Sequence, residues 1–511
     1  MASPPSPQPS VDAKELSSSV GKSGSIASGK DVESPPEIDR IEERKALWKI
    51  DLLIIPLVGM YYLLSFIVSE PHPNIGNARI AGLQKGLHMT NQDFSTALTV
   101  TYVPYIAMEL PMNLLMKRLG ANVTLPLMVT LWGMVCACQG AVKSYGGLLA
   151  CRFFLGALEG GLFPGITLYL SQFYKRHQMQ LRFAMMFSST SLAGAFSGLL
   201  AAAIQNMDGL RGLSGWAWIF ILEGTFTTVF GLATWVLIPA GPRDLKILTP
   251  SERDAYTAAL AEDWSGDADA DGQEEDAFSW NEVASVFTNA PHVLISLVML
   301  LFNGVTLFGL ANFTPTIVGA LGYSATHTQL LTVPPYACSF VVSILCSYAS
   351  DRMKQRGAMA TIMSLVAAAG YAIFLGTSNM HANYGALFLQ IIGVYSIAPC
   401  LSTWNANNVQ PHVRRATGIA LAFVSTNIGG IISTWIFTDP PRFHKASSIN
   451  LAFSLGMATV SLFLILFLRS VNARKREIVQ RLEKEQPGGQ WDSRAERRRL
   501  GDRHPRFEYT T

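Results

Sequence analysis

The sequence predicts an all-α, polytopic membrane protein with 12 transmembrane helices in two pseudo-symmetric six-helix halves. Of the 511 residues, 49% are hydrophobic and only 15% are charged, whereas about a quarter of the residues of soluble globular chains are charged. Apolar runs of about the 20 residues that a helix needs to cross a bilayer recur along the chain. They lie near 50–68, 94–116, 122–142, 147–170, 181–204, 216–239, 291–313, 328–349, 358–377, 383–404, 416–437 and 449–468.

Polar segments separate these runs into halves. The first long apolar run starts near Leu52, too late for a secretory signal. The N-terminal segment is rich in Ser, Pro and Gly, a composition that cannot bury enough apolar area to order itself. The expected parts are a tail with a short charged lead-in helix (1–48), the first six-helix half (49–240), an acidic central loop (241–290), the second half (291–470) and a C-terminal tail (471–511).

Lys and Arg in the short loops predict the orientation, because they accumulate on the cytoplasmic side. With the N-terminus inside, ten such residues fall at inner helix ends and six at outer ones. Both termini are therefore expected in the cytoplasm. The inner set is Lys117, Arg118, Lys175, Arg176, Arg182, Arg352, Lys354, Arg356, Arg414 and Arg415; the outer set is Arg79, Lys85, Lys143, Arg211, Arg442 and Lys445.

Composition argues against several other kinds of protein. The formal net charge of +3 is too small to indicate a nucleic-acid partner. All six cysteines fall within apolar runs, and the pair Cys136 and Cys138 does not have a zinc-site spacing. We therefore expect no metal, no other cofactor and no enzymatic activity.

A short basic turn repeats between the halves. MKRLG (116–120) follows the second span, and SDRMKQRG (350–357) follows the eighth. Any cytosolic turn attracts Arg and Lys, but the matching position of the two turns favours an internal duplication. The turn residues with an expected structural or gating role are Arg118, Asp351, Arg352 and Arg356.

With this second turn, the six-plus-six plan resembles the major facilitator superfamily. Finer strings resemble its anion:cation symporter branch, in particular the fungal allantoate permease group, which includes nicotinate, pantothenate and other carboxylate permeases. The similarity extends from about Lys49 to Leu468. The strings are NIGNARIAGL (74–83), ELPMNLLMKR (109–118), RFFLGALEGGLFPG (152–165), AGAFSGLLA (193–201), WIFILEG (218–224), NFTPTIVGALGYSATHTQLLTVPPY (312–336), WNANN (404–408) and NIGGII (427–432).

Ionisable residues inside the spans are the first functional candidates, because placing them in a membrane is costly. Arg152 and Glu159 in span 4 share one helix face about 10 Å apart. A carboxylate removed from water can exchange a proton near neutral pH, and the resemblance implies proton coupling for the span-4 Glu. The alternative for Glu159 is a structural pair with Arg152 or with the backbone. For Glu109 and Glu223 we favour a structural role.

An anionic substrate needs hydrogen-bond donors and a positive group. Arg152 could supply the charge, and Trp404 and Tyr336, with Tyr395, could stack on a planar ring. Membrane asparagines could equally hold helices together. The candidate amide donors are Asn303, Asn312, Asn405, Asn408 and Asn427.

In the residues just before NIGNA, the sequence differs from the pattern of this permease group. The group has an Asp-Arg pair there, implied to face the substrate and share proton coupling, whereas this chain reads LSFIVSEPHPNIGNA. Because two prolines interrupt a regular helix, span 1 should end near Val68 and restart at NIGNA. Three explanations remain open: Glu70 and His72 replace the pair, a misplaced splice junction has altered the sequence, or coupling has been lost.

A second departure is Ala217, where the group favours Arg. The resulting hypothesis is a monomeric plasma-membrane transporter that takes up a small organic anion with protons. A metabolite exporter of the same fold is the first alternative. A nutrient sensor that does not transport is the second, and the short polar tails disfavour it.

Overall fold

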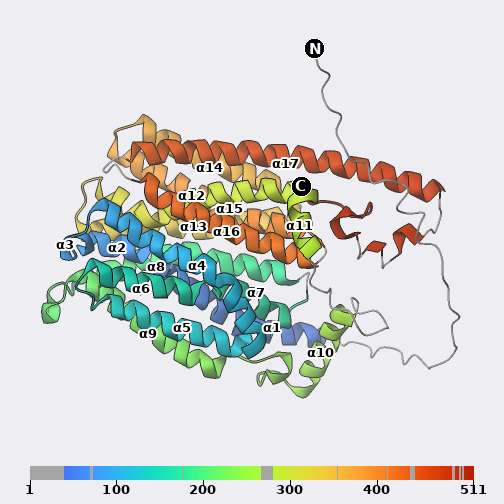
Figure 1. Ribbon diagram of the computed structural model, residues 1–511, viewed down its shortest axis with the longest axis horizontal. Helices are drawn as coiled ribbons and strands as arrows, with labels where there is room; N and C mark the ends of the chain where they lie inside the picture. The colour runs from blue at the N-terminus through green and yellow to red at the C-terminus, as the bar shows by residue number, and fades with distance from the viewer. Residues whose placement is uncertain are drawn as a thin grey trace, which may run out of the picture.

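A computed structural model describes residues 40–69, 73–175, 178–265, 280–353, 355–410, 412–437, 443–485, 490–493, 496–497 and 500–511. Its described secondary structure is helical, and the prediction of an all-α fold is confirmed (Figure 1). The first half contains α1 (Arg40–Leu64), α2 (Pro73–Ile80), α3 (Leu83–Gly86), α4 (Asn91–Leu119), α5 (Ala121–Gln139), α6 (Tyr145–Glu159), α7 (Leu162–Phe173), α8 (Met179–Gln205) and α9 (Gly215–Leu237).

The second half consists of six long helices. Two shorter helices, α10 (Pro250–Ser265) and α11 (Trp280–Asn289), lie between the halves in the chain, within the segment expected to be a polar loop. The six are α12 (Pro291–Gly319), α13 (Ala325–Met353), α14 (Arg356–Gly376), α15 (Met380–Asn407), α16 (His412–Ile436) and α17 (His444–Glu485).

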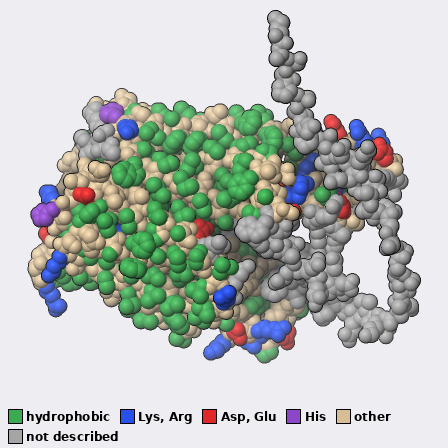
Figure 2. Space-filling model, viewed as in Figure 1, with side chains coloured by type: hydrophobic (Ala, Val, Ile, Leu, Met, Phe, Trp, Pro, Cys, Tyr) green, Lys and Arg blue, Asp and Glu red, His purple; other side chains and the backbone are tan. Residues whose placement is uncertain are grey.

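Twelve membrane-crossing segments follow from these helices, six in each half, as predicted. In the described part, ten segments are long and apolar enough to cross a membrane. The remaining two are α4 and α8, which are 29 and 27 residues long and lie in the bundle beside the others. Figure 2 shows the expected surface, with apolar side chains over the middle of the bundle and charged ones towards its two ends.

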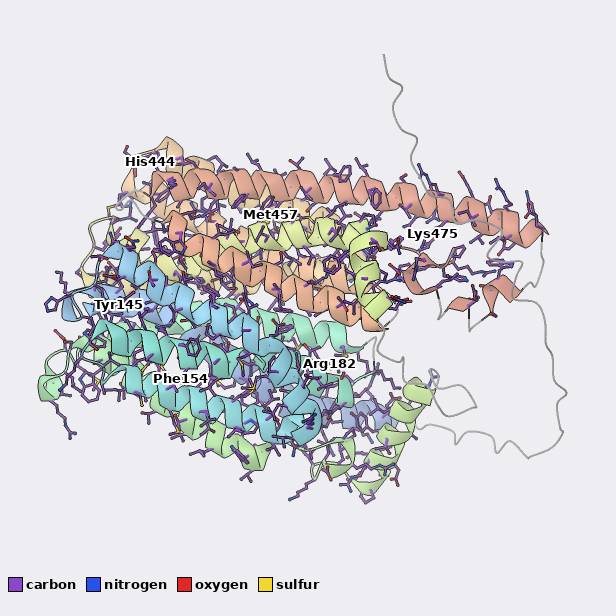
Figure 3. All side chains as sticks on the ribbon, in the orientation of Figure 1. Tyr145, Phe154, Arg182, His444, Met457 and Lys475 are labelled. Carbon is purple, nitrogen blue, oxygen red and sulfur yellow. The ribbon has the colours of Figure 1, made fainter. Side chains whose placement is uncertain are left out.

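The two ends of the bundle differ. We call the end where α1 begins and where α10, α11 and residues 501–511 lie the terminal end, and the opposite one the loop end (Figure 1). In Figure 3, Tyr145 and His444 mark the loop end, whereas Arg182 and Lys475 lie towards the terminal end. At the terminal end, Arg182 of α8 donates two hydrogen bonds, of 2.9 and 2.7 Å, to the carboxylate of Asp51 of α1.

The first span leaves regular α-helical geometry shortly before the prolines, whose segment 70–72 lies outside the described residues. The helix α1 is continuous from Arg40, so the charged lead-in is part of the span, and it passes into a π-helical segment, Ser65–Ser69. A new helix, α2, restarts at Pro73. Glu70 and His72, proposed above as replacements for the Asp-Arg pair, lie outside the described residues.

Span 4 is also broken, whereas the sequence analysis treated 147–170 as one run. The helix α6 ends at Glu159 and α7 begins at Leu162, with Gly160 and Gly161 between them. A side chain at Gly160 would clash with the backbone carbonyl of Tyr105 in α4. The glycines therefore permit a close approach of span 4 to span 2, and they place the break directly after the buried carboxylate.

The two halves join through neutral groups near the loop end. The Ser95 hydroxyl of α4 donates to the Thr434 carbonyl oxygen of α16 at 2.8 Å. The indole N–H of Trp435 donates to the Thr99 hydroxyl at 3.0 Å. The halves also touch where α8 of the first half packs against α13 of the second. A Cβ on Gly194 would lie 2.6 Å from the Tyr336 ring there. The loop end is thus closed in this conformation.

Candidate functional site

A cavity lies between the two halves and takes its walls from both. It encloses about 700 Å³, including space open to solvent. Its position between the halves, in the middle of the membrane helices, is where alternating-access transporters bind substrate. The wall consists of Tyr62, Phe66, Tyr105, Phe163, Thr190, Leu300, Asn303, Leu307, Phe308, Tyr395, Ala398, Pro399, Ser402, Ala422, Phe423, Thr426 and Asn427.

The wall is aromatic with a few neutral polar groups. Two of the predicted substrate contacts, Asn303 of α12 and Asn427 of α16, belong to it, as does Tyr395. The amide oxygen of Asn303 is buried and has no hydrogen-bond partner among the described residues. It is therefore a free acceptor at the cavity. Among the described residues, the wall contains no Lys, Arg, His, Asp or Glu.

An aromatic pair crosses the cavity between the halves. The rings of Phe163 in α7 and Phe423 in α16 have centroids 3.8 Å apart and planes inclined by 35°. Phe163 also lies against Tyr62, with ring centroids 6.0 Å apart. A planar apolar substrate would meet ring faces from both halves here, and movement of one half would separate this pair.

Glu159 is fully buried at the end of α6, one helical turn before Phe163. The Ser65 hydroxyl, in the π-helical segment of span 1, donates a hydrogen bond of 2.5 Å to Glu159 Oε1. Phe66, the next residue after Ser65, lines the cavity. The carboxylate therefore lies between two helix interruptions, and each adjoins a cavity-lining residue.

Arg152, predicted as a substrate contact, is not among the cavity residues. It is fully buried inside the first half, with its guanidinium 5.8 Å from the centre of the Phe220 ring of α9. Its three nitrogens have no hydrogen-bond partner among the described residues. Arg152 and Glu159 interact electrostatically, as their shared helix face predicts.

The other predicted contacts lie elsewhere in the second half. Asn312 is buried near the loop end, where its carbonyl oxygen faces Gly76 of α2. The hydroxyl of Tyr336 donates to Thr314 at 3.4 Å. Asn405 donates to the Gly418 carbonyl oxygen at 3.1 Å, which joins α15 to α16. Trp404 and Asn408 bond to residue 510 at the terminal end.

Two further buried carboxylates of the first half have no described ion-pair partner. The sequence analysis suggested Lys117 or Arg118 as partners of Glu109, but Glu109 forms no ion pair with Arg118, and the Lys117 side chain lies outside the described part. Glu223 is buried in α9, and neither carboxylate oxygen has a hydrogen-bond partner among the described residues. Their structural role stays a prediction.

The second basic turn has a defined internal geometry. Asp351 accepts a 2.9 Å hydrogen bond from Arg356, across the end of α13 and the start of α14. Arg352 donates to the Tyr348 hydroxyl at 3.2 Å. Gly357 packs against Trp404, because a Cβ there would lie 2.6 Å from the indole ring. This turn is therefore fixed to the terminal end of α15.

Sequence reasoning missed most of the cavity wall. The rings of Tyr62, Phe66, Tyr105, Phe163 and Phe423 lie in apolar runs, where an aromatic residue gives no sign of whether it faces lipid, protein or a cavity. The sequence did offer a reason to consider Phe163 as a site residue, because it follows the Glu159-Gly-Gly string by two residues.

Comparisons with known proteins agree with this geometry. A sequence model of the Major Facilitator Superfamily matches residues 52–434. An uncharacterized transporter of Schizosaccharomyces pombe is 33% identical over 444 residues, which cover 86% of each chain. A high-affinity nicotinic acid transporter of Saccharomyces cerevisiae is 30% identical over 486 residues, which cover 95% of this chain and 88% of the relative.

A solved structure shares the fold at low sequence identity. It is a bacterial homolog of the human lysosomal transporter Spinster, in an inward-facing and occupied conformation. The TM-score is 0.59 and the sequence identity 12%, with 81% of this chain and 96% of the other covered.

Proposed function

The chain belongs to the major facilitator superfamily, and from that premise we propose that it takes up a small organic anion together with protons by alternating access. The proposed substrate is a carboxylate of the size of nicotinate, pantothenate or allantoate. The nicotinic acid transporter among the relatives supports this substrate class. No part of the proposal requires a metal or cofactor.

The observation that carries the proposal is the position of Glu159. It is a fully buried carboxylate that accepts a hydrogen bond from Ser65 and lies one turn from the cavity wall. A hydroxyl can donate to a carboxylate and, after rotation, accept from a carboxylic acid. Ser65 can therefore pair with either form of Glu159, as a proton carrier requires.

The chemistry of the wall suggests how an anion is bound. The described cavity residues offer amides, hydroxyls and ring faces, and no cationic side chain is among them. Burying an unpaired carboxylate is costly, whereas a neutral acid can be paired by hydrogen bonds. We therefore propose that the substrate occupies the cavity with its carboxyl group protonated, near Asn303 and Asn427, and that its planar part contacts the Phe163 and Phe423 rings.

We further propose that the terminal end faces the cytoplasm, in a monomeric transporter of the plasma membrane. Arg182 and the Asp351-Arg356 turn lie at that end, consistent with the excess of basic residues at inner helix ends. In this orientation, the closed loop end is the extracellular one.

Uptake measurements test the function directly. Cells without their own permeases would express the chain and receive labelled nicotinate, pantothenate, allantoate or biotin at several external pH values. We expect accumulation of one of these acids that increases with external acidity and is abolished by a protonophore. Saturable uptake that changes neither with pH nor with the protonophore would contradict proton coupling. Failure to take up any of the four acids would contradict the proposed substrate class.

Export of an uncharged metabolite is the second candidate. The observation that favours it is the wall itself, whose described residues are largely aromatic and include no cation. Inside-out and right-side-out vesicles separate the two functions. An exporter would concentrate its substrate only in inside-out vesicles under the physiological proton gradient, whereas the proposed symporter would do so only in right-side-out vesicles.

A further inference from the structure

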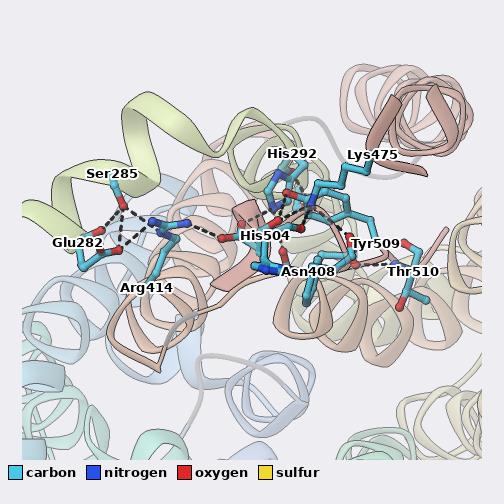
Figure 4. Close-up of polar contacts among 12 residues, drawn as sticks. Glu282, Ser285, His292, Asn408, Arg414, Lys475, His504, Tyr509 and Thr510 are labelled. Atoms are coloured by element: carbon cyan, nitrogen blue, oxygen red, sulfur yellow. Dashed lines mark hydrogen bonds and ion pairs between the residues drawn. The ribbon is translucent and has the colours of Figure 1, made fainter. Parts of the chain in front are cut away.

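Residues 501–511, called the tail segment below, fold back over the terminal end of the second half (Figure 4). The segment contacts side chains from five helices, α11, α12, α15, α16 and α17. It is polar and follows α17 by about 15 residues, so its attachment rests on specific contacts rather than on a long apolar surface.

Its first attachment is a buried ion pair. Asp502 is 1% exposed and accepts a hydrogen bond from Arg414, a fully buried residue near the start of α16. Arg414 also donates to Glu282 at 2.8 Å and to Ser285 at 2.9 Å, both in α11. Burial raises the pKa of the Asp502 carboxyl to about 6, so this carboxylate remains charged at neutral pH.

The second attachment surrounds Lys475 of α17. Its ammonium group donates to the backbone carbonyl oxygens of Asp502, His504 and Phe507, at 2.5, 3.2 and 3.1 Å. It also lies 4.3 Å from the centre of the Tyr509 ring. Three acceptors satisfy all three N–H donors of a lysine, and the ring face adds a cation–π contact.

The third attachment pairs asparagine side chains with the tail backbone. Asn472 of α17 donates to the Tyr509 carbonyl oxygen and accepts from its N–H, at 2.8 and 2.9 Å. Asn408, which follows α15, makes the same two-way contact with Thr510 at 3.0 and 2.8 Å. The indole N–H of Trp404 donates to the same Thr510 carbonyl oxygen at 2.8 Å. Two neighbouring tail residues therefore join α15 to α17.

This linkage bears on a helix that forms the cavity wall. Tyr395, Pro399 and Ser402 of α15 line the cavity, and Trp404 and Asn408 lie on the terminal side of Pro399. Proline removes one backbone hydrogen bond, so a helix bends most readily there. The tail segment ties the part of α15 beyond Pro399 to α17, which runs along the edge of the bundle opposite α5 and α9 (Figure 1).

We propose that the tail segment is an autoinhibitory latch, which holds α15 back against α17 and so opposes closure of the terminal end. With the loop end already closed, the next step of alternating access brings the terminal ends of the two halves together. Bending of α15 towards the first half would contribute to that closure, and the bonds to Asn408 and Trp404 resist it. Release of the tail segment then speeds the step and favours the conformation open at the loop end.

The test is a distance measurement between spin labels at the terminal end. Labels would replace Met185 of α8 and Met353 of α13, both exposed, in a full-length chain whose native cysteines have been replaced. The tail segment is weakened by Asp502→Asn combined with Tyr509→Ala. The matched control is Glu508→Gln, which removes only the exposed pair with Arg476.

We expect the weakened latch to enrich the shorter distance, with about a fivefold change in the population ratio for each hydrogen bond lost. The control should keep the parent distribution. Deletion of residues 501–511 should act in the same direction, and addition of a peptide of that sequence should reverse the shift. An unchanged or longer distance after deletion would overturn the proposal.

This inference rests on the alternating access of the proposed function but not on its substrate or proton coupling. The distances are recorded without substrate and at one pH. Failure of every acid in the uptake panel would therefore leave the latch measurement valid, and an unaffected distance would leave the uptake result valid.

Discussion

Ser65 and Glu159 are joined by a 2.5 Å hydrogen bond between two interrupted helices. Ser65 begins the π-helical segment of span 1, and Glu159 ends α6 just before the glycine break of span 4. Helix interruptions leave backbone groups without helical partners and let a segment adjust its position. The carboxylate is thus held between two segments whose backbone departs from regular α-helical geometry.

Replacement of Glu159 by Gln should separate transport from coupling. The amide keeps the shape of the side chain but cannot carry a proton, so exchange of labelled for unlabelled substrate should persist while proton-driven accumulation is lost. Both are measured in the same cells over a pH series. The matched control is Glu109→Gln, because Glu109 is also buried in the first half, whereas the Ser65 hydroxyl bonds to Glu159. Equal accumulation by Glu159→Gln and the parent chain would exclude the coupling role.

The amides of the cavity should determine substrate affinity. Asn303→Leu and Asn427→Leu each remove one polar group from the wall, and the half-saturating substrate concentration should increase about fivefold for each lost hydrogen bond. Initial uptake rates across a substrate series give this value. Asn405→Ala is the control, because its amide bonds to Gly418 and lies outside the wall. An equal loss of affinity in the control would show that these amides act through helix packing.

A bulky residue at Gly194 should prevent closure of the loop end. Gly194 of α8 faces the Tyr336 ring of α13, and a Cβ there would already lie 2.6 Å from it. Gly194→Leu should therefore reduce transport by about tenfold or more, since the closed conformation becomes overpacked. It should also leave a cysteine introduced at Ser402 of the cavity wall reactive from the loop end. Gly385→Leu is the control, because a Cβ at Gly385 meets no atom within 4 Å; similar inhibition by both would contradict the prediction.

The orientation can be checked with epitope tags. Tags at residue 2, in the central loop at 270 and after residue 511 should all be reached by antibody only in permeabilised cells. The positive-inside bias and the position of α10 and α11 beside the terminal end are the reasons for this expectation. Labelling of any one tag on intact cells would reverse the proposed orientation.

The architecture was predictable because a bilayer demands about 20 apolar residues per crossing, and run length alone reveals such segments. The interruption after Val68 was also predictable, since Pro71 and Pro73 cannot continue a regular helix. The break after Glu159 was not predicted. A pair of glycines is common in membrane helices as a packing surface, and only the approach of the Tyr105 backbone gives Gly160 its role here.

The site was predictable only in part. Asn303 and Asn427 line the cavity, whereas Asn312 and Asn405 lie outside its wall, yet all four are isolated amides in apolar helices. A helix that is apolar on every side gives no indication of which face meets the partner half. The contacts of Trp404 and Asn408 could not be inferred either, because their partner Thr510 lies about 100 residues away in a polar tail.

The hydrogen bonds between the halves at the loop end are few and neutral, so breaking them costs little. Ser95, Thr99, Thr434 and Trp435 join the halves through three hydrogen bonds, which together contribute about 3 kcal/mol. A ligand with millimolar affinity supplies about 4 kcal/mol on binding. Even a weakly held substrate, if it prefers the opened form, can offset their loss. Tight substrate binding, which would slow release, is therefore not needed to offset these three bonds.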